Sequence, residues 1–139
     1  RSSDERRISR MDEYPVECAT GSLRPSDRPA TSHFAHRWTD AGVDVVAGFT
    51  GAELLHVAVA ACVLNDLYRE ADRRGIPLAG VRVQAAGGFD AEWASTGIDY
   101  HVEVDSPADP ASITRLVELV DELAEIPRAV RAGAPVRRR

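Results

Sequence analysis

The chain has 139 residues, enough for one domain with a buried core and too few for two. Hydrophobic residues make up 44% and charged residues 28%, a balance typical of a folded domain rather than a disordered segment. The net charge of -5 argues against nucleic acid or an anionic membrane as a partner. All 17 basic residues are arginines, which excludes Schiff-base chemistry on lysine and a phosphate-binding loop that needs lysine.

The N-terminal residues predict no targeting segment. Residues 1–13 are mostly polar and charged, and we expect a flexible leader followed by a single domain over 14–139. The leader lacks the apolar stretch of a secretory signal, so we expect a cytoplasmic protein. The longest apolar stretch, Leu54–Leu64, is interrupted by His56 and is shorter than the roughly 20 residues that cross a bilayer. We therefore expect no membrane association.

Short strands are predicted in the first third of the chain. Apolar and β-forming residues cluster over 14–20 and 33–39, and Val43–Val46 is a third strand candidate. Glycine and proline residues over 21–29 predict a loop between the first two clusters. This part of the chain is therefore expected to form a small antiparallel β region.

A long helix is predicted to follow, ending at about Arg74. Thr50 and Glu53 have the spacing of a capping box, and Gly75 and Pro77 are typical of a helix end. The first two-thirds of the helix are apolar on nearly every face, so it has to be buried all round. Because one chain of this length can hardly surround it, we predict an obligate homodimer.

The remaining elements complete an α+β pattern. Strands are predicted over 81–89 and 98–104, the second from its alternation of apolar and polar residues. A second helix is predicted over Ala111–Glu125 and should stop before Pro127, and Val130–Val136 is predicted as a short helix or an edge strand. The order β-β-β-α-β-β-α places two antiparallel groups of strands around one buried helix.

Several segments together resemble one known family. Gly51–Leu55 and Ala58–Cys62 match the central helix of the OsmC/Ohr family, Arg73–Leu78 matches the turn after it, and Ile126–Val136 looks like its C-terminal segment. The likeness covers roughly residues 14–136. It implies an OsmC-like fold, in which antiparallel sheets surround the long central helices of an intertwined homodimer and the active sites lie at the subunit interface.

The resemblance also implies a chemistry. The best-known members of the family are thiol-dependent peroxidases that reduce organic hydroperoxides, and Cys62 matches their peroxidatic cysteine, which is oxidised to a sulfenic acid. Arg24 is the best match for the family's arginine, with Arg28 as the second choice. A glutamate at the start of the central helix also activates the thiolate in the family, and Glu53 is the carboxylate nearest to that position.

Two positions depart from the family pattern. The family's second cysteine, which closes a disulfide, falls at Ile126, so an external thiol or dithiol would have to reduce the sulfenic acid. The family's glutamate falls at Ala52, one residue before Glu53. One residue rotates a helical side chain by about 100°, so Glu53 faces a different direction.

Cys62 needs a positive neighbour if it is to react. A free thiol is only a few per cent ionised at neutral pH, and Cys62 is too far along the helix for the helix dipole to help. Asp66 lies one turn further on the same face, where its charge would raise the thiol pKa. The thiolate therefore depends on Arg24 or Arg28, and without them Cys62 is a buried small hydrophobe.

The other cysteine and the histidines have simpler interpretations. Cys18 is an alternative resolving thiol, although an inert cysteine in a strand fits as well. His33 and His36 would point to opposite faces of a strand, so we predict no metal and no cofactor. His56 is interpreted as a hydrogen-bonded histidine at the subunit interface.

The sequence supports two hypotheses of function. The first is a one-cysteine peroxidase that takes an organic hydroperoxide as a small apolar substrate and an external thiol or dithiol as reductant. The second is a divergent OsmC-fold protein without peroxidase activity, which binds a small apolar ligand or catalyses non-redox chemistry at the dimer interface. Cys62 and the arginines of the loop favour the first, whereas Ile126 and Ala52 favour the second.

Overall fold

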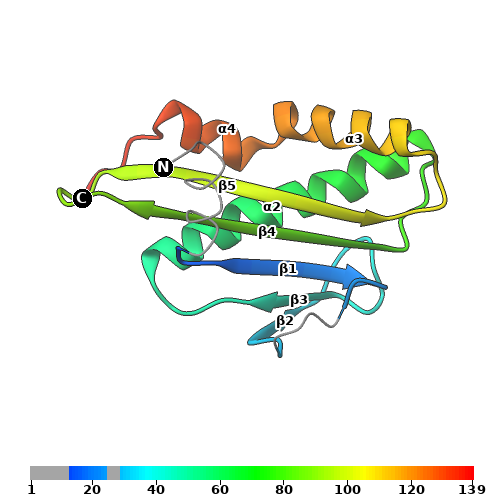
Figure 1. Ribbon diagram of the computed structural model, residues 1–139, viewed down its shortest axis with the longest axis horizontal. Helices are drawn as coiled ribbons and strands as arrows, with labels where there is room; N and C mark the ends of the chain where they lie inside the picture. Colours follow the sequence, from blue (N-terminus) through cyan, green and yellow to red (C-terminus); the bar gives the residue numbers. More distant parts are fainter. Residues whose placement is uncertain (1–12, 25–28) are drawn as a thin grey trace, which may run out of the picture.

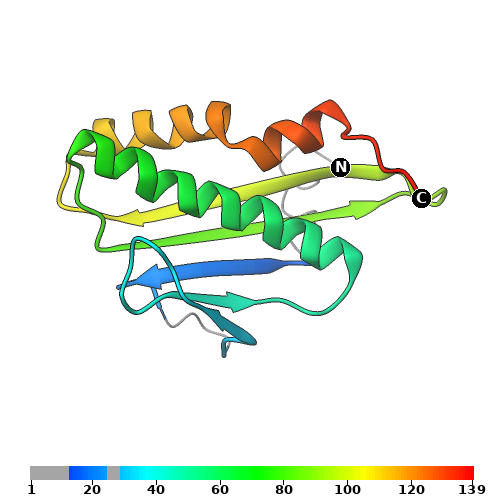
Figure 2. The ribbon, with the colours of Figure 1, turned by 180° about the vertical axis from the view of Figure 1, so that it is seen from behind.

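The computed structural model describes residues 13–24 and 29–139. The expected leader, apart from Glu13, and the candidate Arg28 lie outside the described residues. The described part contains five strands and three helices, with all three helices on one side of a single sheet (Figures 1 and 2).

The two predicted groups of strands join into one antiparallel sheet of five strands, in the order β2-β3-β1-β4-β5. β1 is the strand that unites them, because it pairs with β3 on one side and with β4 on the other. Cys18 of β1 stands opposite Val45 of β3 and Val83 of β4. The strand bounds are Val16–Gly21 for β1, Ser32–Phe34 for β2, Val43–Val46 for β3, Gly80–Phe89 for β4 and Ser95–Asp105 for β5.

The predicted ends of the long helix are confirmed. Helix α2 spans Gly51–Arg74, and its N-terminus carries the expected capping box. The Thr50 hydroxyl accepts from the Glu53 backbone N–H at 3.1 Å and donates to the Glu53 carboxylate at 2.9 Å. Gly75 ends the helix in the left-handed region at φ 65, which glycine adopts without steric strain.

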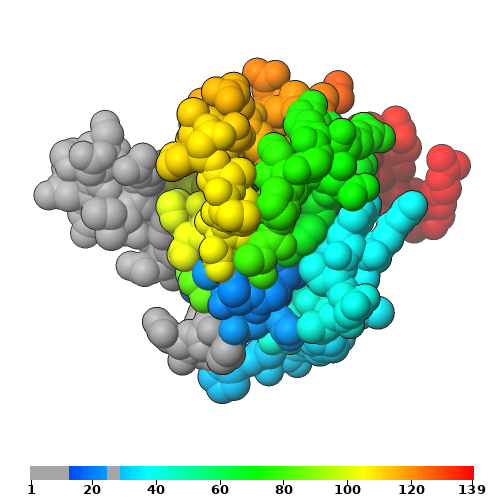
Figure 3. All heavy atoms as spheres, turned by 90° about the vertical axis from the view of Figure 1, so that its right-hand side faces the viewer, coloured from blue at the N-terminus to red at the C-terminus, as the bar shows by residue number. Residues whose placement is uncertain are grey.

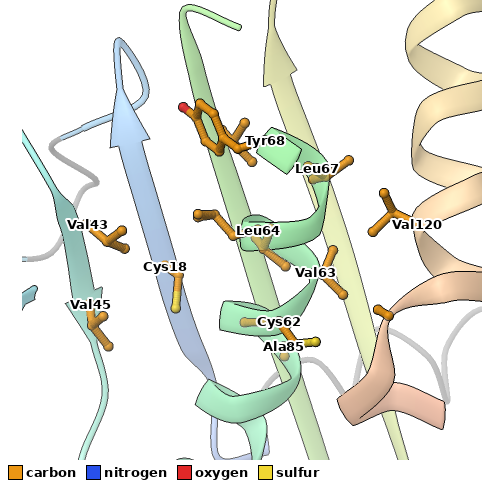
Figure 4. Packing of buried hydrophobic residues seen from close by; sticks show 14 of the residues in the cluster. Cys18, Val43, Val45, Cys62, Val63, Leu64, Leu67, Tyr68, Ala85 and Val120 are labelled. Carbon is orange, nitrogen blue, oxygen red and sulfur yellow. The ribbon is translucent and has the colours of Figure 1, made fainter. Parts of the chain in front are cut away.

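One face of α2 packs on the sheet and forms the core. Val63, Leu64 and Leu67 of α2 are at most 1% exposed and lie over Val83 and Ala85 of β4. Figure 4 shows the three side chains of α2 and Ala85 of β4 in this core. Viewed from the end of the molecule, α2 lies between α3 and the segment that follows β2 (Figure 3).

The opposite face of α2 is open in the single chain, so the helix is not buried all round. Leu54 is 43% and Leu55 38% exposed. The helix is long and apolar enough to cross a membrane by composition alone, but half of its apolar window is buried against its own chain. A helix in the core of a water-exposed domain can have the same length and apolar composition. The packing of α2 on the sheet accounts for its composition.

The second predicted helix, 111–125, is confirmed to within two residues at its C-terminal end, and a separate short helix follows it. Helix α3 spans Pro110–Leu123, and the extended backbone of Ala124 (ψ 120) separates it from helix α4, Glu125–Ala132. Pro127 lies in the first turn of α4, where its missing N–H removes no helical hydrogen bond. The break directs the start of α4 toward α2.

Candidate functional site

Cys62 lies where α2 meets the start of α4. Its side chain is buried, and its Sγ accepts a hydrogen bond from the backbone N–H of Ile126 at 3.5 Å. Figure 4 shows the sulfur on the side of α2 that faces α4. The fold thus brings together Cys62 and the position at which the resemblance places a second cysteine, and isoleucine at that position excludes a disulfide there.

Two carboxylates stand beside this thiol. Asp66, one turn after Cys62, is 2% exposed, whereas Glu125 is at the exposed first position of α4. The sulfur and one oxygen of each carboxylate lie within 4.8 Å of one another. Arg69 contacts the Asp66 carboxylate at 3.2 Å. We call Asp66 and Glu125 the carboxylate pair.

Burial and negative charge keep the thiol protonated. Burial raises the pKa of Cys62, and the charges of Asp66 and Glu125 raise it further, whereas the N–H of Ile126 opposes them. Burial, followed by hydrogen bonding with Glu125, raises the pKa of Asp66 to about 6. The pKa of Glu125 is lowered by its own backbone N–H and by hydrogen bonds with Asp66 and Cys62. At neutral pH the negative charge therefore lies on the carboxylates rather than on the sulfur.

Within one chain Arg24 is not brought to Cys62. Its guanidinium contacts the Asp44 carboxylate at 3.3 Å, and His33 bonds the other oxygen of that carboxylate at 2.7 Å. The two charged side chains that act most strongly on the Cys62 thiol are both carboxylates. Arg28 lies outside the described residues.

Glu53 is also occupied elsewhere. One of its carboxylate oxygens accepts from the Thr50 hydroxyl and the other from the Gly48 backbone N–H. Nine residues separate Glu53 from Cys62, which is roughly 13 Å along a helix. In the single chain Glu53 holds the start of α2 and does not contact the thiol.

The histidines and Cys18 take structural roles within the chain. His56 is buried and makes its expected hydrogen bond within the chain, donating from Nδ1 to the Tyr14 carbonyl oxygen at 2.9 Å. His36 bonds Thr39 and Asn65, so it shares no ligand with His33. Burial, followed by the charge of Glu17, raises the pKa of Cys18 to about 12. The Cys18 thiol is therefore kept protonated in this setting.

The group of Cys62, Asp66 and Glu125 is also the one set of three potential metal donors that come together in residues 13–24 and 29–139. Arg69 already supplies a positive charge to Asp66. We assign no metal to it. Sequence reasoning identified Cys62 and Asp66 but missed Glu125, although its position next to Ile126 was a usable signal.

An apolar pocket of about 430 Å³ lies on the other side of α2. It separates α2 from β3 and from the segment that follows β2, and His36 bridges its rim through a hydrogen bond to Asn65. The volume and the apolar lining are typical of a site for a small molecule. Its apolar walls are built mainly by Phe34, Trp38, Val43, Val45, Val57 and Leu64.

Comparison with known proteins confirms the resemblance. The sequence model of the OsmC-like protein family matches residues 42–138, so the chain belongs to the OsmC-like family. The match runs from β3 to the C-terminal segment and includes Cys62 and Ile126. Comparison with proteins of curated function finds no match.

Two solved structures show the same fold. An OsmC-like protein from Mycoplasma pneumoniae is 15% identical, with a TM-score of 0.57 over 76% of this chain and 89% of the other. An OsmC-like hydroperoxide resistance protein from Jannaschia sp. is 11% identical, with a TM-score of 0.51 over 90% of this chain and 91% of the other. At these identities the similarity establishes the architecture and leaves the chemistry to the residues of the site.

Proposed function

We propose that the protein is a thiol-dependent peroxidase that reduces organic hydroperoxides through Cys62. The observation that carries this proposal is the contact of Cys62 Sγ with Ile126 N, because it sets the cysteine of the central helix against the C-terminal segment as the resemblance implies. The thiol and the hydroperoxide give a sulfenic acid and an alcohol. One external thiol then condenses with the sulfenic acid and releases water, and a second thiol restores Cys62 and leaves as a disulfide.

The test is capture of the sulfenic acid. We expect one equivalent of cumene hydroperoxide, in the presence of dimedone, to add a single adduct to the protein. Trypsin cleaves at Arg37 and so places Cys18 and Cys62 in different peptides, which assigns the adduct to Cys62. Protein that stays unmodified under this dosing would eliminate the peroxidase.

The proposal includes a homodimer and a cytoplasmic setting. A second copy is the proposed cover for the open face of α2, where Leu54 and Leu55 are exposed. It is also the proposed source of the arginine, Arg24 or Arg28, because Arg24 contacts Asp44 and does not reach the Cys62 of its own chain. The cytoplasm supplies the thiols or dithiols that the cycle consumes, in keeping with a role in the response to oxidative stress.

Leu54→Arg is expected to dissociate this dimer, because a charge on the open apolar face cannot be desolvated against a second helix. Light scattering after size exclusion should show the wild type at twice the chain mass and the variant at 15.1 kDa. Thr114→Arg, which adds the same charge at an exposed position of α3, serves as the control. Wild-type protein at 15.1 kDa would contradict the dimer.

The pocket beside α2 favours a second candidate function, the binding of a small apolar ligand without redox chemistry. Trp38 lines this pocket, whereas Trp93 is 77% exposed on the loop between β4 and β5. A ligand in the pocket is expected to change the fluorescence of wild-type protein and of Trp93→Phe, but not that of Trp38→Phe. If an apolar ligand changes the tryptophan fluorescence of the wild type and of both variants to the same extent, it does not bind beside Trp38, and this candidate function is wrong.

A further inference from the structure

We propose that the carboxylate pair of Asp66 and Glu125 accepts the proton of the Cys62 thiol while the sulfur is oxidised. This inference rests on the proposed function and adds to it a general base supplied by the chain itself. The resemblance assigns the activation of the thiol to an arginine and to a glutamate at the start of the central helix. Within residues 13–24 and 29–139 of one chain, neither Arg24 nor Glu53 fills these roles at the sulfur, because Arg24 contacts Asp44 and Glu53 holds the start of α2.

The geometry of the site supplies the contact that a base needs. The Cys62 sulfur and one oxygen of each carboxylate come within 4.8 Å of one another, which places both carboxylates beside the thiol. Cys62 and Asp66 are four residues apart on α2, which places them on one face of the helix. Glu125 reaches them only because the chain breaks at Ala124 and restarts α4 beside α2.

The charges around the carboxylate pair set the pKa at which the pair can take up a proton. On α2 the groups that act on Asp66 are Arg69, which pairs with it at 3.2 Å, and the negative charge of Glu70. On α4 the group is Glu125. Glu70 is itself held by three arginines, Arg69, Arg73 and Arg74. With the pKa of Asp66 raised to about 6, the pair is ionised at neutral pH but close to the range in which a general base works best.

A buried thiol with a raised pKa has to lose its proton during the reaction rather than before it. In the proposed step the S–H proton passes to Glu125 as the sulfur attacks the terminal oxygen of the hydroperoxide. The O–O bond breaks, and the leaving alkoxide takes the proton from the pair and departs as the alcohol. The sulfur is oxidised to the sulfenic acid, the peroxide is reduced, and the pair is ionised again.

The experiment compares two reactions of Cys62 in wild type, Glu125→Gln and the control Glu122→Gln, which removes an exposed charge from α3. One is single-turnover oxidation by cumene hydroperoxide, trapped with dimedone. The other is alkylation by iodoacetamide, in which iodide leaves without a proton. Both rates are measured on either side of pH 6 with EDTA present, and circular dichroism checks the fold.

The rates of oxidation and of alkylation are expected to change in opposite directions in Glu125→Gln. The wild-type oxidation rate should rise as the pH increases through about 6, because only the ionised pair accepts a proton. In Glu125→Gln the oxidation rate at neutral pH should fall by at least about tenfold, the lower end of the effect of a general base. Alkylation should become faster in this variant, because removing a negative charge lowers the thiol pKa.

Any other outcome overturns either the general base or the peroxidase activity on which it rests. If Glu125→Gln is oxidised as fast as wild type or faster, the carboxylates only repel the thiolate, and the base is overturned while the peroxidase stands. If wild type is alkylated but never oxidised, the peroxidase falls and the base with it. If Glu125→Gln does not fold, Asp66→Asn, which keeps the shape of the side chain, must show the same separation of rates or the inference fails.

Discussion

Replacement of Cys62 by serine is expected to abolish the reduction of organic hydroperoxides, with a loss of at least about a hundredfold in rate. A serine hydroxyl keeps the shape of the side chain but is neither acidic enough nor polarisable enough to displace an alkoxide from a peroxide. In the proposed function the hydroperoxide chemistry depends on Cys62, because burial raises the pKa of Cys18 to about 12 and keeps that thiol protonated. The measurement is consumption of cumene hydroperoxide coupled to oxidation of a dithiol.

Cys18→Ala provides the comparison for this result. Cys18 is wholly buried in β1, so the variant is expected to lose some stability and to retain the rate per folded molecule. If Cys18→Ala loses activity and Cys62→Ser keeps it, the hydroperoxide reacts with Cys18 rather than with Cys62, which would contradict the proposed function. Loss in both variants would indicate that Cys18 reduces the sulfenic acid, and the external thiol would then act on a disulfide.

Leu67→Ala is expected to lower the free energy of unfolding by about 3 kcal/mol, within the range for leucine truncation in a well-packed core. Leu67 is fully buried on the face of α2 that packs on the sheet, so alanine would leave a cavity with no water to fill it. Urea denaturation followed by tryptophan fluorescence measures the change, at one fixed protein concentration because the proposed dimer would make the stability depend on concentration.

Val136→Ala is the matched control for this stability change. Val136 is 97% exposed beyond α4, so its truncation is expected to change the free energy of unfolding by less than about 0.5 kcal/mol. A loss below about 1 kcal/mol in Leu67→Ala would show that the face of α2 that carries Leu67 does not pack on the sheet in solution.

The local features of the fold were predictable from the sequence because they depend on residues a few positions apart. The capping box of Thr50 and Glu53 and the left-handed Gly75 define α2 through contacts within one turn. The alternation over 98–104 lies within β5. The stop before Pro127 was predictable as well, because proline has no N–H to bond to the carbonyl of Leu123. The start of α4 at Glu125 was not, because it depends on contact with α2.

For the site, the sequence by itself identified Cys62 as the candidate thiol and placed Asp66 on the same face of the helix, but it missed Glu125. Only the tertiary structure decided which residues lie beside these groups: Glu125 and Ile126 lie at the thiol, and Arg24 lies at Asp44. It also decided that β1 lies between β3 and β4 in the sheet. The physical reason is that a helical period relates residues three or four apart, whereas Cys62 and Ile126 meet through the packing of two helices on one sheet. The charge that surrounds a buried thiol is set by that packing, and with it the reactivity of the sulfur.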